Sequence, residues 1–178
     1  NIILSSRLFP HQEAIVFDDQ RLSYAELERL SAQAAFVLRE KSVQRGDRVA
    51  IVVANVPAFV VWYYACLRLG AIVVTISTRL SDDEMAFILS DCGSRVVVRG
   101  DTLSDSISDP MPECVGHTLS VSDDGLMVEG KPLGDCPSIG EAVFEEMEPD
   151  DAATILYTSG TTGFPKGATL SHRNVRST

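Results

Sequence analysis

Residues 152–170 read AATILYTSGTTGFPKGATL, and this stretch carries the strongest structural signal in the chain. It opens with an apolar run at 152–157 that is typical of a buried β-strand, and it closes with a second short run at 168–170. Between them lies a segment rich in hydroxyl side chains and glycine, with one proline and one lysine. The pattern predicts two strands joined by a turn-forming loop.

The residue types of this loop suit a bound anion. Glycine reaches positive φ angles, so that backbone N–H groups can converge on an anion in a tight bend, and it lets a phosphate come close. Hydroxyls add hydrogen-bond donors, and lysine adds a mobile positive charge. We therefore predict a polyphosphate site built from three glycines, four hydroxyl residues and one lysine: Gly160, Gly163, Gly167, Thr158, Ser159, Thr161, Thr162 and Lys166.

The loop differs from the Walker A motif, G-x-x-x-x-G-K-[ST], which opens a helix. Here Lys166 lies three residues beyond Gly163 and is followed by Gly167. The alternative is an ordinary hairpin rich in glycine and threonine that binds nothing.

Charge is distributed unevenly along the chain. The formal net charge is −10, yet no acidic residue lies between Tyr157 and the end, where Lys166, Arg173 and Arg176 are all basic. The overall charge argues against nucleic acid and anionic lipid as partners, whereas the loop segment is locally suited to a polyanion.

Upstream, strand and helix signals alternate. Residues 14–17 and 21–22 predict a short hairpin, and Ser23 with Glu26, like Ser81 with Glu84, forms the capping-box pattern that begins a helix. The first of these helices should run to about Lys41, and the second should bury Met85, Ile88 and Leu89. Strands alternating with helices predict an α/β fold with a largely parallel sheet.

The apolar stretch 49–67 is about as long as a membrane span, but Asn55 and Pro57 interrupt it. A buried parallel strand at 49–53 followed by a helix fits better. Asn55 can cap this helix, Pro57 suits its first turn and Gly70 ends it. We therefore expect no transmembrane segment.

The chain divides into three parts. Residues 1–99 form an α/β subdomain, and residues 152–178 hold the strand, the loop, the next strand and the start of a helix. Residues 100–151, with five of the eight prolines, form a loop-rich acidic segment with short strands at 118–121 and 126–128.

The acidic pairs of this segment, at 123–124 and 150–151, are either metal ligands or solvated turns. His172, behind the N-cap candidate Ser171, belongs either to a first helical turn or to a polar wall for a ligand.

The loop, together with residues 170–174 (LSHRN), resembles the AMP-binding signature of the acyl-adenylate-forming enzymes. This superfamily contains acyl-CoA and aryl-CoA synthetases, peptide-synthetase adenylation domains and firefly-type luciferases. Residues 22–27, 45–51, 70–74 and 79–84 also resemble that family's N-terminal blocks in order and spacing. One departure is Thr75-Ile76-Ser77, where such enzymes commonly have a Pro-x-Asn or Pro-x-Asp turn.

The resemblance implies an acid-thiol ligase of the acyl-CoA synthetase type. This chain would be the N-terminal part of the large domain of that enzyme. ATP would bind with Mg²⁺ and a small carboxylic acid, and coenzyme A would be the co-substrate. The cradle for the β- and γ-phosphates would comprise Lys166, as the catalytic residue, and Thr158, Ser159, Gly160, Thr161, Thr162 and Gly163, with the Thr158 hydroxyl approaching the metal. The alternatives are a peptide-synthetase-type adenylation domain and a non-catalytic truncated module, which would form a homodimer through an uncovered apolar surface.

Family members are usually several times longer than 178 residues, so we expect a fragment that is inactive by itself. The residues that distinguish a fatty acyl substrate from an aryl one are expected outside this sequence. Both classes of acyl group therefore stay open. Four scattered cysteines and the lack of a signal-peptide pattern favour reduced thiols and a cytoplasmic protein.

Overall fold

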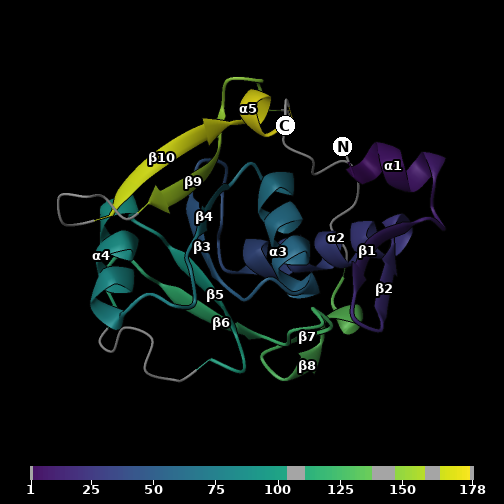
Figure 1. The fold of residues 1–178 in the computed structure, drawn as a ribbon, viewed down its shortest axis with the longest axis horizontal. Helices are drawn as coiled ribbons and strands as arrows, with labels where there is room; N and C mark the ends of the chain where they lie inside the picture. The colour runs from purple at the N-terminus through teal and green to yellow at the C-terminus, as the bar shows by residue number, and fades with distance from the viewer. Residues whose placement is uncertain (1, 104–110, 138–146, 159–164, 177–178) are drawn as a thin grey trace.

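A computed structural model describes residues 2–103, 111–137, 147–158 and 165–176 of the chain (Figure 1). In chain order, its helices and strands are α1 Ile2–Leu8, β1 Glu13–Phe17, β2 Gln20–Ser23, α2 Tyr24–Glu40, β3 Arg48–Val52, α3 Pro57–Arg68, β4 Ile72–Thr75, α4 Asp82–Cys92, β5 Val96–Gly100, β6 His117–Val121, β7 Met127–Val128, β8 Lys131–Pro132, the 3₁₀ turn η1 Leu133–Asp135, β9 Ala152–Thr158, β10 Lys166–Ser171 and α5 His172–Arg176.

The strands from β3 onward form one sheet in the order β10-β9-β4-β3-β5-β6-β7-β8. The five strands from β9 to β6 pair in parallel, whereas β10, β7 and β8 pair antiparallel to their neighbours. The predicted α/β architecture with a largely parallel sheet is therefore confirmed.

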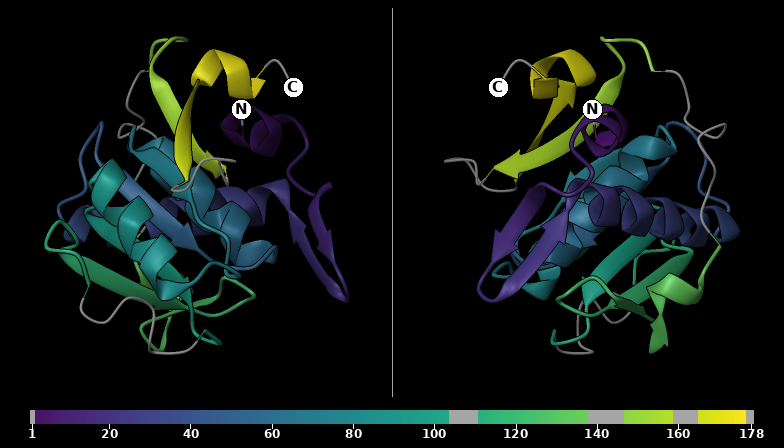
Figure 2. Two further views of the ribbon diagram at one scale, coloured as in Figure 1. Left: turned by 60° about the vertical axis from the view of Figure 1, so that its left-hand side comes forward. Right: turned by 90° about the vertical axis from the view of Figure 1, so that its right-hand side faces the viewer.

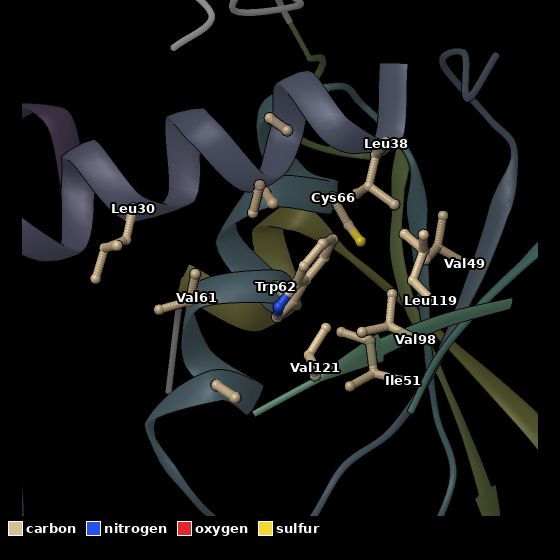
Figure 3. Close-up of a cluster of buried hydrophobic side chains, with 14 of the residues drawn as sticks. Leu30, Leu38, Val49, Ile51, Val61, Trp62, Cys66, Val98, Leu119 and Val121 are labelled. Atoms are coloured by element: carbon tan, nitrogen blue, oxygen red, sulfur yellow. The ribbon is translucent and has the colours of Figure 1, made fainter. Parts of the chain in front are cut away.

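The central strands bury side chains on both faces. On one face, Val49 and Ile51 of β3 belong to a core cluster that includes residues of α2 and α3. On the other face, Ala50 and Val52 pack with buried residues of α4. Figure 3 shows the fully buried Trp62 of α3 pointing into the first cluster. Burial on two faces explains why β3 reads as a continuous apolar run.

The two predicted capping boxes are present. The Ser23 side chain accepts from the Glu26 backbone N–H and Glu26 accepts from the Ser23 backbone N–H, and Ser81 and Glu84 do the same at α4. Met85, Ile88 and Leu89 are buried, as predicted. Since each box joins residues three apart, local sequence was enough to locate both helix starts.

The start of α3 differs from the prediction. Pro57 does occupy the first turn, but the N-cap is Val56 and no side chain caps the helix, so the assignment of Asn55 as the cap was wrong. Instead, the Ala58 backbone N–H donates to the Asp123 carbonyl, 3.1 Å away in the turn between β6 and β7. At its other end, the helix is followed by Gly70 at φ 64°, as expected for a terminating glycine.

The segment between β5 and β9 extends the sheet. The short strands predicted there are confirmed as β6 and β7, and Leu119 and Val121 of β6 lie in the core. Figure 2 shows the β1–β2 hairpin beside α2, apart from the large sheet. Among the described residues, no helix is both long enough and apolar enough to cross a membrane.

Candidate functional site

The predicted pair of strands around the glycine-rich loop is present as β9 and β10. They are antiparallel, and Lys166 lies directly opposite Thr158 while Gly167 lies opposite Tyr157. Residues directly opposite each other project from the same face of a sheet, with Cβ atoms about 4.5–5.5 Å apart. The hairpin thus brings the hydroxyl that precedes the loop and the lysine that follows it to one face.

Thr158 lies at the carboxyl edge of the parallel strands. β9 pairs with β4 from Thr154 to Leu156, in the same direction as β3 and β5. In open α/β sheets, ligands bind in the crevice outside the carboxyl ends of the strands. The hairpin therefore places the loop's two ends where such sheets hold their ligands (Figure 1).

Thr158 and Lys166 are both exposed, as a ligand-binding pair must be. In the described ranges, no carboxylate lies within ion-pair distance of the Lys166 ammonium group. Its charge is thus available to an anion. The other predicted cradle residues, Ser159, Gly160, Thr161, Thr162 and Gly163, lie outside the described residues.

Gly167 has a different role from the one predicted. Its φ angle is not in the positive range, so the expectation of a left-handed bend there was wrong. A Cβ at this position would lie 2.9 Å from Cζ of Tyr157 and 3.0 Å from Cγ2 of Ile155. Gly167 is required because the Tyr157 ring lies against its backbone.

The Tyr157 hydroxyl reaches across to helix α4, where it donates a hydrogen bond of 2.5 Å to Oδ2 of Asp91. Burial of the phenol, followed by the bond to Asp91, raises the pKa of Tyr157. The hydroxyl therefore keeps its proton and stays a donor. Sequence analysis missed this contact because Asp91 lies 66 residues away and no local pattern links the two residues.

The acidic pairs make ordinary structural contacts. Asp150 binds Arg173 through two hydrogen bonds, and Asp151 forms an ion pair with Arg45 at 2.7 Å. The Asp124 carboxylate accepts from Ser122 and from the Leu126 backbone N–H. In the described ranges, no group of three or more His, Cys, Asp or Glu side chains could hold a metal ion.

Behind the hairpin, α5 begins as its sequence predicts. The Ser171 hydroxyl accepts from the Asn174 backbone N–H, and Oδ1 of Asn174 accepts from the Ser171 backbone N–H. This reciprocal pair places His172 in the first turn of a helix. The backbone N–H groups of His172 and Arg173 donate to the carbonyls of Asp151 and Pro149, which fixes the end of β10 to the start of β9.

The segment that follows β4 is held by backbone and side-chain hydrogen bonds. The Ile76 backbone N–H donates to the Ile51 carbonyl at 3.1 Å, and the Arg79 N–H donates to the Ser77 hydroxyl at 3.3 Å. Thr75 is thus the last residue of β4, and the turn itself follows at Thr78 and Arg79, closed by the Leu80 backbone N–H, which donates to the Ser77 carbonyl at 3.3 Å.

Comparisons with known proteins agree with this arrangement. The long-chain-fatty-acid–CoA ligase FadD13 of Mycobacterium tuberculosis is 38% identical over 160 residues, which cover 89% of this chain and 31% of FadD13. Tyrocidine synthase 1 of Brevibacillus parabrevis is 30% identical over 167 residues, which cover 94% of this chain and 14% of that protein. The chain thus spans about a third of the length of FadD13 and a smaller share of tyrocidine synthase 1.

The solved structure of a Mycobacterium tuberculosis fatty acyl CoA synthetase superposes with a TM-score of 0.83 and 31% identity, covering 98% of this chain and 34% of that one. The sequence profile of the family described as AMP-binding enzyme matches residues 5–178. The chain therefore belongs to the AMP-binding enzyme family.

Proposed function

We propose that the enzyme containing this sequence activates a carboxylic acid with ATP and passes the acyl group to coenzyme A. The carboxylate attacks the α-phosphorus, which gives an acyl-adenylate and releases pyrophosphate. The coenzyme A thiol then attacks the acyl carbon, forming a thioester and releasing AMP. The observation that carries the proposal is the β9–β10 register, which sets Thr158 and Lys166 on one face at the two ends of the loop.

In this proposal, the loop holds the β- and γ-phosphates of ATP. Lys166 neutralises the charge that builds up on the leaving pyrophosphate, and Thr158 donates its hydroxyl to a phosphate oxygen. The roles assigned to Ser159, Gly160, Thr161, Thr162 and Gly163 rest on their residue types and order. Such catalysis is mainly positioning and electrostatic stabilisation, so a fixed lysine at the hairpin end is the central requirement.

Mg²⁺ would accompany ATP and neutralise part of its phosphate charge. This ion takes oxygen ligands, keeps several waters, and is held by substrate phosphates with one or two protein groups. The exposed Thr158 hydroxyl is an oxygen donor of the required kind. It fits this limited role without a carboxylate cluster.

The substrate is a small-molecule carboxylic acid, and we take a fatty acid as the first candidate because the name of FadD13 specifies long-chain fatty acids. The test is exchange of labelled pyrophosphate into ATP by the full-length enzyme, with fatty, aryl and amino acids supplied in turn. We expect exchange that depends on one of these acids. Pyrophosphate exchange that proceeds equally without any acid, or no exchange with any of the acids, would contradict acid activation.

A peptide-synthetase-type adenylation domain is the second candidate, favoured by the similarity to tyrocidine synthase 1. The thiol acceptor separates the two. An acyl-CoA synthetase forms a thioester with free coenzyme A, whereas an adenylation domain requires the thiol arm of a carrier protein. We further infer a cytoplasmic enzyme, because all four cysteines are free thiols.

A further inference from the structure

The end of the hairpin that carries Thr158 and Lys166 has little support from the sheet. Within the described part of the chain, β9 pairs with β4 only through Thr154, Ile155 and Leu156, and β10 is an edge strand whose only strand partner is β9. The last residues before the loop therefore extend past the point where the sheet holds them. Another contact must fix their position relative to the core.

Tyr157 provides this contact. Its ring packs against the buried cluster that β3 forms with α4, and a Cβ on Gly167 would lie 2.9 Å from the ring. Its hydroxyl donates to Asp91 of α4 at 2.5 Å. One side chain thus joins β9, β10 and α4 next to the residue that opens the loop.

The helix at the other end of this contact is firmly held. Ile88 and Leu89 of α4 are fully buried, and the capping box closes the start of the helix. At its carboxyl end, Arg48 donates to the carbonyls of Cys92 and Gly93 at 2.6 and 3.0 Å. Asp91 is therefore a fixed anchor, and a hydrogen bond to a charged acceptor is stronger than one between neutral groups.

We propose that Tyr157, Asp91 and Gly167 form a tether that positions Thr158 and Lys166 for the triphosphate of ATP. The proposal rests on the proposed function. Tyr157 is a positioning residue that acts through the two loop ends, and its hydroxyl performs no chemistry on the substrate. Gly167 belongs to the tether because any side chain there would displace the ring.

The first test is Tyr157→Phe and Asp91→Ala in the full-length enzyme. We expect the KM for MgATP to rise about tenfold in each, because a hydrogen bond to a charged group is lost. The KM for the carboxylic acid and the rate of thioester formation from preformed acyl-adenylate should change less than about twofold. Asp91→Asn keeps an acceptor oxygen and should recover most of the affinity. An unchanged KM for MgATP in Tyr157→Phe would overturn the proposal.

Tyr63→Phe is the matched control. Tyr63 lies on α3, and its hydroxyl interacts with Thr154 near the other end of β9, so this variant removes a tyrosine hydroxyl that contacts the same strand away from the loop. It should leave the KM for MgATP unchanged, and an equal rise in both variants would contradict a specific tether. The double variant Tyr157→Phe/Asp91→Ala should match either single one, whereas additive losses would show that the two residues act separately.

Hydrogen exchange tests the tether without any activity. In Tyr157→Phe, but not in Tyr63→Phe, the amides of residues 166–168 should exchange faster, because the hairpin end loses its anchor. If the wild-type enzyme shows no acid-dependent pyrophosphate exchange, the proposed function fails while this measurement still decides the tether. Unchanged amide exchange in Tyr157→Phe would refute the tether even in an active enzyme.

Discussion

Gly167 illustrates how a glycine in a binding loop's sequence can serve packing instead of backbone conformation. Sequence alone suggested a bend with positive φ, but the residue lies in β10 with the Tyr157 ring against it. A glycine pattern cannot distinguish the two uses, because both disfavour a Cβ. Only the antiparallel register, which sets Gly167 opposite Tyr157, reveals the reason.

Gly167→Ala should therefore destabilise the protein. We expect a loss of about 1–3 kcal/mol in the free energy of unfolding, since the added methyl group must displace the ring. Urea unfolding followed by circular dichroism measures it. Combining the change with Tyr157→Leu, which removes the ring, should shrink the loss.

Gly134→Ala is the control for this prediction. Its φ is not in the positive range, and the nearest atom to its added Cβ is 3.8 Å away, at an Arg29 nitrogen. The control should change stability by less than about 0.5 kcal/mol. Similar losses at both glycines, or a Gly167 loss that persists without the ring, would contradict the packing role.

Thr158 offers a test of the site itself. Thr158→Val keeps the branched shape but removes the hydroxyl proposed to bind phosphate. We expect the KM for MgATP to rise by about fivefold, because a hydrogen bond is lost. Thr169→Val on β10 is the control, since Thr169 lies opposite Ile155 and so faces the α4 side. Equal effects in both variants would argue against a phosphate contact at Thr158.

At the scale of elements, the sequence located what local patterns determine. Both capping boxes and both hairpins were predicted because their partners lie close together in the chain. The cap of α3 was missed because the acceptor is a backbone carbonyl at Asp123, which no side-chain pattern encodes. Contacts between distant segments depend on the completed fold.

The capping box of α4 predicts a dependence on pH. Backbone and side-chain hydrogen bonds from Ser81 lower the pKa of Glu84 below its ordinary value of 4.5. A carboxylate whose pKa is lowered by folding stabilises the folded state above its unfolded-state pKa. This stabilisation is lost as the pH falls through its folded-state pKa. Wild type should therefore exceed Glu84→Gln in stability near neutral pH, and this difference should shrink below about pH 4.5.

Urea unfolding of both proteins across this pH range measures the difference. A difference between wild type and Glu84→Gln that stays constant with pH would contradict the role of the carboxylate.

At the scale of the whole molecule, alternating strand and helix signals were sufficient to predict a parallel α/β sheet. The order of its strands was not predictable, because it depends on which buried faces meet. β3 lies between β4 and β5 with buried side chains on both faces, while β10 is an edge strand. The site's place followed from the fold: β9 ends at the carboxyl edge, which the sequence did not specify.

This arrangement predicts a gradient of amide protection. β3, β4 and β5 should exchange slowest, and the amides of the separate β1–β2 hairpin should exchange fastest among the strands, because it lacks the double cover of helices. Hydrogen exchange followed by mass spectrometry measures this gradient. Comparable protection in the β1–β2 hairpin and β3 would contradict the two-sided core as the stable centre.

The rates of the two half-reactions in Lys166→Ala, measured separately, test the central claim most directly. Removing one charged donor from a site of this kind slows the step that it serves by roughly 100- to 1000-fold. We predict such a loss in acid-dependent pyrophosphate exchange, with little change in thioester formation from preformed acyl-adenylate, and no loss in the control Lys131→Ala on β8. Equal slowing of both half-reactions by Lys166→Ala, or unimpaired exchange, would contradict a lysine that binds the departing phosphates.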